Sequence, residues 1–420
     1  MQKVIGKNVI GFVGLSHLGL NYLAASVEKK FNVIGVDLNQ KLILKINKFK
    51  LPFSEPQLEN VLKKNRKKIN FTSNFKKLKC CNIVFISKDV ETDSKGKPNL
   101  KEINKLINLT KKNLNKKCVL VILSQLRPGF MKKINYDNSK LYYQIETLIF
   151  GKGLERALKP ERIIVGSSNK SYKINRIYFN YLKKFNCPII NMSYESAELT
   201  KIAINIYLAS SITTTNVLAE VCNSIGANWN EIKPALQLDA RIGPKAYLKP
   251  GLGISGGNIE RDINSLSNLI SKNSSLKRFT TTLNQNSKYM KEWVMRKLLK
   301  EKIFKSKNTT ISILGLSYKE NTSSTKNSSS LKLIDALKYK KLIKVYDPKV
   351  KFNKQTNNCR QMSSINETLK GSQILVLMTP WKNFMKINIP KNIKIVLDPF
   401  QILEINSIKN LKIKYYSIGN

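Results

Sequence analysis

The chain has 420 residues, of which 42% are hydrophobic, and it carries a formal net charge of +47. This length predicts two or three domains, and the hydrophobic fraction is enough to build their cores. No uninterrupted apolar run reaches the roughly 18 residues needed to cross a bilayer. The N-terminus also lacks the apolar segment of a signal peptide. We therefore expect a soluble cytoplasmic protein that is not inserted in a membrane.

The excess of positive charge raises the question of nucleic acid. The lysines run through the whole chain beside abundant Asn and Ile, and no segment interleaves basic and aromatic residues as a stacking surface would. We therefore do not expect nucleic acid as the primary partner, although the positive field favours anionic ligands such as a nucleotide diphosphate.

Cysteine and histidine are few and scattered. The chain has one histidine, His17, and its six cysteines, none in a CxxC pair, are Cys80, Cys81, Cys118, Cys187, Cys222 and Cys359. A zinc site would have few candidate ligands, so we expect reduced thiols and no structural metal.

The predicted elements begin with a βαβ unit. Residues 8–14 predict a short buried strand, the residues up to about 30 a helix, and residues 32–37 a second strand. Further apolar runs with helical spacers follow at 82–87, 118–124 and 162–166. Alternating strands and helices predict a parallel sheet with helices on both faces.

A long helix is predicted next. Residues 196–225 contain neither Gly nor Pro, and Gly226 suits the C-terminal cap of a helix. We expect this helix to be the backbone of a middle helical region that reaches about residue 300.

A second α/β pattern completes the chain. Its predicted strands are 309–315, 344–347, 373–378 and 393–398. The basic segment 297–307 is the expected linker. The fold class is thus α/β, with two Rossmann-like doubly wound domains joined by a central helical domain with a long helix. The expected boundaries are 1–192, 193–300 and 301–420.

The turn after the first strand carries an imperfect GxGxxG motif. Gly14 and Gly19 are in place, Ser16 replaces the middle glycine, and Asp37 ends the second strand. In a dinucleotide-binding turn, the backbone approaches the pyrophosphate at a helix N-terminus and the acid binds the ribose hydroxyls, which favours NAD over NADP. The alternative is a structural strand-turn-helix without a ligand.

Two further groups of residues can carry chemistry. Lys201 and Asn205 are four residues apart on the long helix and share a face among apolar neighbours, so a buried Lys201 could transfer protons. The alternative is a solvated lysine. Asp262 follows the glycine-rich segment 251–257 and would either hold a water or a lysine, or act as an acid at the N-terminus of a helix.

Ordered motifs extend across the chain. They are Gly14 to Gly19 with Asp37, Glu55-Pro56, Pro128-Gly129, residues 196–201 with Asn205, residues 239–243, residues 250–262, and residues 346–348. Together they resemble the UDP-glucose/GDP-mannose dehydrogenase family over nearly the whole chain. The resemblance implies an NAD-dependent dehydrogenase that oxidises the CH2OH group of a UDP-sugar such as UDP-glucose for polysaccharide precursor synthesis, as a homodimer.

The resemblance also implies roles for single residues. Lys201 and Asp262, with a water, would manage the proton of the substrate hydroxyl. Asn205 would stabilise the developing alkoxide, and Glu146 would assist hydrolysis of an acyl intermediate. The implied cofactor contacts are Gly14, Ser16, Leu18, Gly19, Asp37, Thr92, Ser124 and Arg261. The implied substrate contacts are Arg241, reaching the neighbouring subunit, with Tyr247, Gly253, Lys319 and Lys326.

The sequence departs from the family at the nucleophile. Asn258 stands where the family has a cysteine, and an amide cannot attack an aldehyde in its place. Gln125 replaces a threonine near the reacting carbon, and Lys326 and Phe400 stand where relatives carry arginines.

Three versions of the chemistry therefore stay open. The reaction stops after one oxidation, the hydrated aldehyde is oxidised directly with Asn258 orienting it, or the enzyme is weak. The alternative function is a non-catalytic protein that binds NAD and nucleotide sugars. A further alternative is a basic nucleic-acid binder on a Rossmann-like scaffold.

Overall fold

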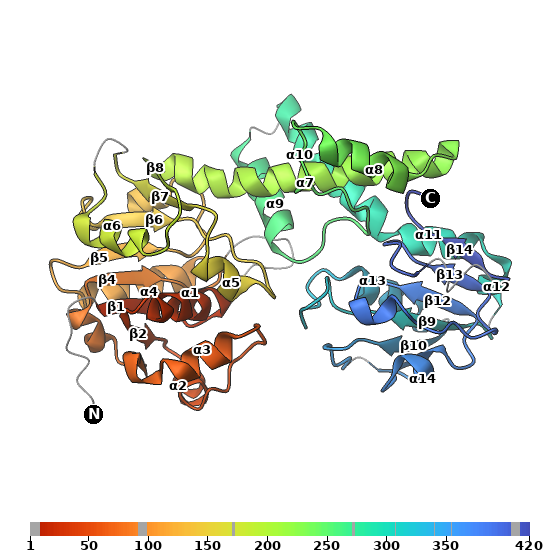
Figure 1. Ribbon diagram of the computed structural model, residues 1–420, viewed down its shortest axis with the longest axis horizontal. Helices are drawn as coiled ribbons and strands as arrows, with labels where there is room; N and C mark the ends of the chain where they lie inside the picture. The colour runs from red at the N-terminus through yellow and green to blue at the C-terminus, as the bar shows by residue number, and fades with distance from the viewer. Residues whose placement is uncertain are drawn as a thin grey trace. The chain divides into compact units, whose positions relative to one another are not determined.

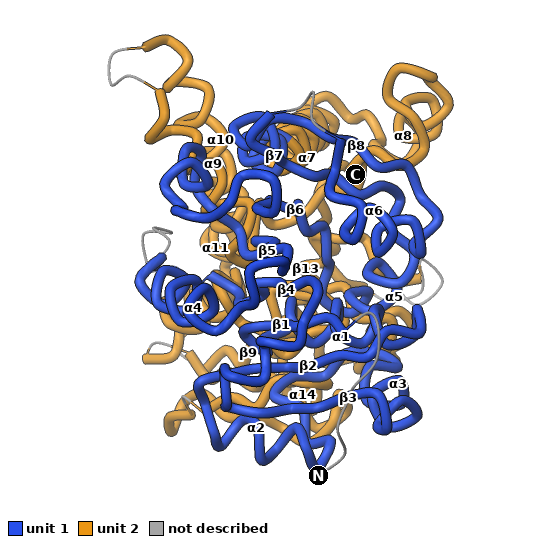
Figure 2. Tube along the Cα trace, turned by 90° about the vertical axis from the view of Figure 1, so that its left-hand side faces the viewer, with its two compact units in different colours: residues 1–203 blue, residues 204–420 orange. Residues whose placement is uncertain are grey.

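The computed structural model describes residues 9–90, 99–169, 173–270, 274–306, 308–339, 341–353, 355–404 and 412–420. It forms two compact units, unit 1 from Met1 to Ala203 and unit 2 from Ile204 to Asn420 (Figure 2). The boundary between the units falls inside the long helix. The division into three domains at 192 and 300 therefore stays a prediction.

Unit 1 is built around one sheet (Figure 1). Its strands are β1 (Val9–Val13), β2 (Asn32–Val36), β3 (Ile69–Thr72), β4 (Ile83–Ile86), β5 (Val119–Ile122), β6 (Leu141–Gln144), β7 (Ile163–Ser167) and β8 (Ile189–Ser193). Its α-helices are α1 (His17–Glu28), α2 (Gln40–Asn47), α3 (Leu58–Lys64), α4 (Lys101–Lys112), α5 (Gly153–Leu158) and α6 (Arg176–Lys183). Single 3-10 turns lie at η1 (Arg66–Lys68), η2 (Phe75–Cys80) and η3 (Met131–Lys133).

The strand order is β3-β2-β1-β4-β5-β6-β7-β8. Six of the seven pairings are parallel, as predicted, and β6 and β7 form the one antiparallel pair. The reason lies in the connection between them. Its only helix, α5, has six residues and packs against α1, so it does not carry the chain back across the sheet.

Alternate residues of each strand face two separate cores. Ile10 and Phe12 of β1 pack in the core that contains α1, while Val9 and Val13 pack in the core that contains α4. A strand buried on both faces reads as a continuous apolar run, which is why the sequence reveals β1, β4 and β5 clearly.

The helix that leaves unit 1 is α7 (Tyr194–Ile225), and the predicted 196–225 matches it within two residues. It ends at Gly226, whose φ of 74° lies in the left-handed region that favours glycine at this position. Within the described part of the chain, α7 is the one helix long and apolar enough to cross a membrane by length and composition, and 33% of its most apolar window is buried.

Unit 2 holds the remaining elements. Its helices are α8 (Trp229–Leu238), α9 (Asn258–Leu269), α10 (Ser275–Lys291), α11 (Trp293–Lys300), α12 (Lys302–Lys305), α13 (Ser329–Leu337) and α14 (Ile365–Leu369), with the 3-10 turn η4 (Lys382–Phe384). Its strands are β9 (Thr310–Leu314), β10 (Leu342–Tyr346), β11 (Cys359–Gln361), β12 (Ile374–Leu377), β13 (Ile395–Leu397) and β14 (Lys414–Tyr416). They form a parallel sheet in the order β11-β10-β9-β12-β13-β14.

The sheets and the helical stretch between them in the chain confirm the expected fold class. The segment 297–307 is not a plain linker as expected, because α11 ends in it and α12 lies within it. Leu298 and Phe304 are buried in the core of unit 2, and this packing accounts for the helices.

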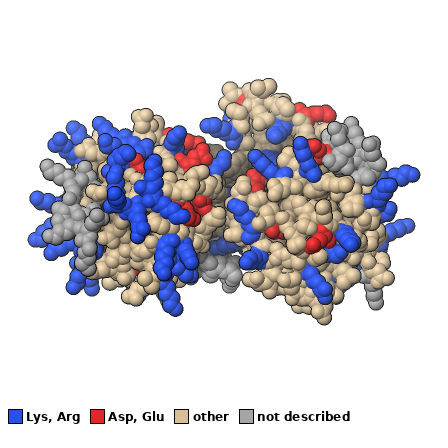
Figure 3. Space-filling model, turned by 60° about the horizontal axis from the view of Figure 1, so that its bottom comes forward, with Lys and Arg blue, Asp and Glu red and all other residues tan. Residues whose placement is uncertain are grey.

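Charged side chains cover both units. On the face drawn in Figure 3, Lys and Arg side chains are dispersed and do not gather into one patch. This distribution matches lysines on solvated faces more closely than a single basic docking stripe.

Candidate active site

The turn from β1 to α1 needs glycine at two positions. Gly14 has a φ of 92°, and a Cβ there would lie 2.8 Å from the Cα of Lys88. A Cβ on Gly19 would lie 2.0 Å from the carbonyl oxygen of Gly14. Both positions therefore exclude residues larger than glycine. This allows α1 to start close to the end of β1, which lies between β2 and β4 in the sheet.

Asp37 organises this turn from the end of β2. One carboxylate oxygen accepts the N–H of Leu15 at 2.8 Å and the other accepts the N–H of Asn39 at 2.9 Å. The side chain is buried, so a ribose hydroxyl would share oxygens that already hold the turn. Asp37 is thus placed as the sequence predicts and also has a structural task.

Unit 2 repeats the arrangement. Gly315 has a φ of 97° after β9, and the N–H of Leu316 donates to Asp347 at 2.7 Å. The turns after β1 and β9 therefore share one hydrogen-bonding pattern, in which the N–H after the glycine donates to the acid at the end of the next strand.

The first turn of α1 meets the loop after β4. Ser16 donates its hydroxyl to the carbonyl of Ser87 at 3.2 Å and accepts the N–H of Asp89 at 2.8 Å. The N–H of Leu18 donates to the Asp89 carboxylate at 3.3 Å. The glycines, the helix N-terminus and Asp37 fit a dinucleotide, but sequence reasoning missed Asp89.

Of two more expected cofactor contacts, the structure places one. Ser124 is buried at the end of β5 and donates its hydroxyl to the carbonyl of Lys88 at 2.6 Å, so it fixes the loop after β4. Thr92 lies outside the described residues.

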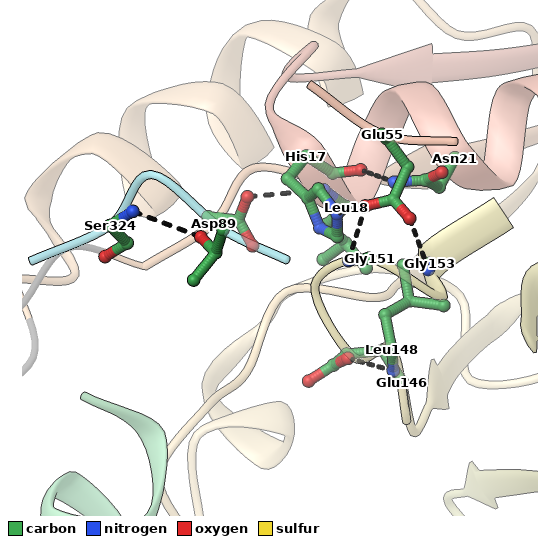
Figure 4. A network of polar contacts seen from close by, with 11 residues as sticks. His17, Leu18, Asn21, Glu55, Asp89, Glu146, Leu148, Gly151, Gly153 and Ser324 are labelled. Atoms are coloured by element: carbon green, nitrogen blue, oxygen red, sulfur yellow. Dashed lines mark hydrogen bonds and ion pairs between the residues drawn. The ribbon is translucent and has the colours of Figure 1, made fainter. Parts of the chain in front are cut away.

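The single histidine lies in the same turn (Figure 4). Nε2 of His17 is 2.6 Å from Oε2 of Glu55, which also accepts the N–H of Gly151 at 3.2 Å, and Oε1 of Glu55 accepts the N–H of Gly153 at 2.8 Å. The ring of Phe150 stacks on the imidazole with centroids 4.0 Å apart. Burial alone would raise the pKa of Glu55, but the hydrogen bonds from His17, Gly153 and Gly151 outweigh it and the pKa is lowered.

Lys201 of α7 is buried and paired. Its Nζ lies 2.8 Å from the Glu146 carboxylate and donates to the Glu146 carbonyl at 2.8 Å. Only 9% of the Lys201 side chain and 15% of the Glu146 side chain are exposed. The alternative of a solvated lysine is therefore wrong, and the pair is suited to exchange a proton.

A second buried carboxylate near the start of α7, Glu198, holds the loop at Pro128-Gly129. Glu198 accepts N–H groups from Gly129 at 2.6 Å and Met131 at 2.9 Å, and burial raises its pKa. This contact fixes the loop that carries Gln125 to the first turns of α7.

Asn205, one helical turn after Lys201, belongs to unit 2. Its side-chain amide donates to the carboxylate of Asp262, and Nε of Arg261 lies 3.2 Å from the other oxygen of that carboxylate. All three residues are buried. Asp262 therefore binds side chains and is not simply an acid at the N-terminus of α9.

The glycine-rich loop before α9 is held by its neighbours. Ser287 of α10 accepts the N–H of Ile254 at 2.9 Å, and Asn327 donates its amide to the carbonyl of Gly256 at 2.9 Å. Gly253 has a φ of 70° in this loop. The loop therefore has a defined shape that presents Asn258, an exposed residue, as the first residue of α9.

The remaining expected substrate residues lie in unit 2. Arg241 is exposed and forms a two-pronged pair with Asp239, with N–O distances of 3.0 and 2.7 Å. Tyr247 is partly exposed, and Nζ of Lys319 lies 5.8 Å from the centre of the Tyr318 ring. The exposed Lys326 lies along Gly257. A common role for these four residues in substrate binding stays a prediction.

An open pocket of about 640 Å³ lies at the carboxyl end of β13. Its walls include Trp229, Lys233, Lys249, Phe400 and Tyr415. Sequence reasoning did not identify this pocket, because its residues come from six separate stretches of the chain.

Metals and thiols complete the chemistry of the site. Among the residues that the structure describes, no group of three or more His, Cys, Asp or Glu side chains could hold a metal ion. All six cysteines are free thiols.

Three family models match the chain in succession. Residues 8–182 match the "UDP-glucose/GDP-mannose dehydrogenase family, NAD binding domain". Residues 195–288 match the central domain of the same family, and residues 312–405 match its UDP binding domain.

Similar proteins carry related names. The chain is 29% identical to a UDP-glucose 6-dehydrogenase of Rickettsia felis over 98% of this chain and 95% of that one. It is 24% identical to UDP-glucose 6-dehydrogenase TuaD of Bacillus subtilis over 98% and 93%. Among solved structures, a UDP-glucose dehydrogenase from Pyrobaculum islandicum matches with a TM-score of 0.84 and 19% identity, covering 99% of each chain. The UDP-N-acetyl-mannosamine dehydrogenase Cap5O of Staphylococcus aureus matches with a TM-score of 0.78 and 18% identity over 98% and 99%. At these identities the structures support the fold.

Proposed function

Because the chain belongs to the UDP-glucose/GDP-mannose dehydrogenase family, we propose that it oxidises the primary alcohol of a UDP-hexose, UDP-glucose first, with NAD as the acceptor. The observation that supports this best is the arrangement on α7. Buried Lys201 is paired with Glu146, and one turn later buried Asn205 is bound to Asp262. NAD, when bound, accepts the hydride that leaves the alcohol carbon. The residues that would hold it are the turn 14–19 and Asp37.

The protein's own groups would manage the proton. Lys201 is held by a carboxylate and a carbonyl oxygen of one residue, so its ammonium group is fixed in position. Once its ammonium group has given a proton to Glu146, the Lys201 amine, with Asp262 and a water, would accept the proton of the substrate hydroxyl while the amide of Asn205 stabilises the alkoxide. Glu146 would supply or remove a proton through Lys201.

Asn258 determines how far the reaction goes. We infer a single two-electron oxidation, in which the alcohol and NAD give the aldehyde, NADH and a proton. A further oxidation through a thioester needs a thiol at this position, and an amide cannot form that bond. The other route to the acid is direct oxidation of the hydrated aldehyde, and it would yield a second NADH.

The nucleotide end is proposed to bind in unit 2. Lys319 and Lys326 supply positive charge for the diphosphate. The pocket at β13 has aromatic walls and two lysines, which suits a nucleoside. Arg241 would serve the neighbouring subunit, since its side chain is exposed.

A second copy of the chain is the proposed partner of α7. Tyr207, Leu218, Val221 and Ile225 are exposed and lie on one face of this helix, at spacings of 11, 3 and 4 residues. An apolar stripe of this kind is typical of a helix that packs against a partner. We also propose a cytoplasmic location, which the free thiols support.

The test is a panel of UDP- and GDP-sugars with NAD, followed by absorbance of NADH and by trapping of carbonyl products. We expect NADH with at least one UDP-hexose and a trappable aldehyde. Binding of NAD and UDP-sugar without NADH formation would favour a non-catalytic binding protein and contradict the proposal.

A further inference from the structure

The N-terminus of α1 is capped by a residue from another segment. The N-cap residue Ser16 makes no side-chain cap hydrogen bond, and the first turn of α1 contains no acidic residue. The N–H of Leu18 donates instead to the carboxylate of Asp89 in the loop after β4, as Figure 4 shows. The free N–H groups at this helix end are the donors that a phosphate uses in a dinucleotide-binding turn.

Asp89 is held in this position by its main chain. Its N–H donates to Ser16, whose hydroxyl in turn donates to Ser87, so the loop is fastened to the turn. The carboxylate therefore meets the helix end through a fixed loop and not through a long flexible side chain.

The charges around Asp89 leave it without a cationic partner. None of the ion pairs between described residues includes Asp89. The neighbouring Lys88 pairs with Glu102 at 3.2 Å, and the nearby groups that act on the Asp89 carboxylate, His17 and Glu146, are themselves bound to Glu55 and Lys201. A second anion brought to this helix end would therefore face an unneutralised like charge.

From these contacts we propose that Asp89 competes with the cofactor pyrophosphate for the N-terminus of α1 and so sets the affinity for the dinucleotide. The inference rests on the proposed use of NAD. When the pyrophosphate binds, the Asp89 carboxylate must leave the N–H of Leu18. When the dinucleotide departs, Asp89 returns and caps the helix.

Binding of NAD, ADP and adenosine to the full chain tests this role. Asp89→Asn keeps an oxygen that can accept from Leu18 but removes the charge, and Asp89→Ala removes both. We expect each variant to bind NAD and ADP about tenfold more tightly, since like charges in close contact are costly, and to bind adenosine unchanged. Glu59→Gln, which alters the net charge equally and lies in an exposed pair with Lys63 on α3, should bind all three ligands as the unaltered protein does.

A merely structural cap would behave differently. NAD affinity that is unchanged or weaker in both Asp89 variants would overturn the inference. Failure of the unaltered protein and both variants to bind NAD would overturn it as well. Tight NAD binding with no sugar oxidation would contradict the proposed function alone.

Discussion

His17 and Glu55 form a buried pair across 38 residues of sequence, with Nε2 and the carboxylate oxygen 2.6 Å apart. The pair joins the first residue of α1 to the turn at residues 151–153, because the same carboxylate accepts two N–H groups there. The contact therefore fixes the start of α1 to the segment at residues 151–153.

Replacing this carboxylate should lower stability in a pH-dependent way. Glu55→Gln should reduce the free energy of unfolding by roughly 2 kcal/mol near pH 7, because a buried charged acceptor of three hydrogen bonds is lost. The pKa of Glu55 is lowered in the folded state, so its contribution is present above about pH 4.3, the unfolded value, and is lost as the pH falls through the folded value. The difference between the two proteins should therefore shrink on acidification.

Urea unfolding at about pH 6 and about pH 3.5 measures this difference. Glu59→Gln is the matched control, because Glu59 forms an exposed pair with Lys63 and should cost at most about 0.5 kcal/mol. An equal loss at both pH values would argue against the lowered pKa.

Lys201 should matter for the reaction and not for cofactor binding. Lys201→Gln removes the ammonium group beside Glu146 and should lower kcat by about 10²- to 10⁴-fold, while the Kd for NAD stays within about twofold. Stopped-flow rates and NADH fluorescence report the two quantities. Lys132→Gln, which loses an exposed pair with Glu195, should keep full activity. A Lys201 variant with normal kcat would remove this residue from the mechanism.

A thiol at position 258 should extend the reaction. Asn258 is the first residue of α9, and a helix N-terminus lowers the pKa of a thiol and increases its reactivity. Asn258→Cys should therefore form a covalent adduct with the sugar, detectable as a mass increase of the intact chain. Ser255→Cys places a thiol in the same loop but outside the helix and should form none. Absence of an adduct in the Asn258 variant would show that this residue does not face the reacting carbon.

The stripe on α7 should control assembly. Leu218→Glu puts a charge among the exposed apolar residues and should convert a dimer to a monomer, as measured by light scattering. Leu44→Glu, at an exposed position on α2, should leave the assembly unchanged. A monomeric unaltered protein would contradict the proposed partner.

The sequence predicts the doubly wound units well because strands such as β1, β4 and β12 are buried on both faces and read as unbroken apolar runs. It does not reveal β3 or β8, whose partly exposed and polar positions interrupt the pattern. The antiparallel orientation of β7 depends on the packing of α5 against α1, a tertiary contact that local sequence patterns do not reveal.

In the candidate site, too, local spacing reveals some residues, while contacts between distant segments cannot be predicted from it. Lys201 and Asn205 are recognisable because they are four residues apart on one predicted helix. The contacts of Glu55 with His17 and of Asp89 with Leu18 join segments 38 and 71 residues apart, and local periodicity carries no information about them. The position of Asp89 directly after a predicted strand was the available signal, since ligands bind at the carboxyl ends of parallel strands.

The amount of NADH formed for each UDP-glucose consumed to completion tests the central claim most directly. With Asn258 in place of a thiol, the account predicts one NADH for each sugar and an aldehyde as the product. Two NADH for each sugar, with a carboxylate as the product, would contradict it.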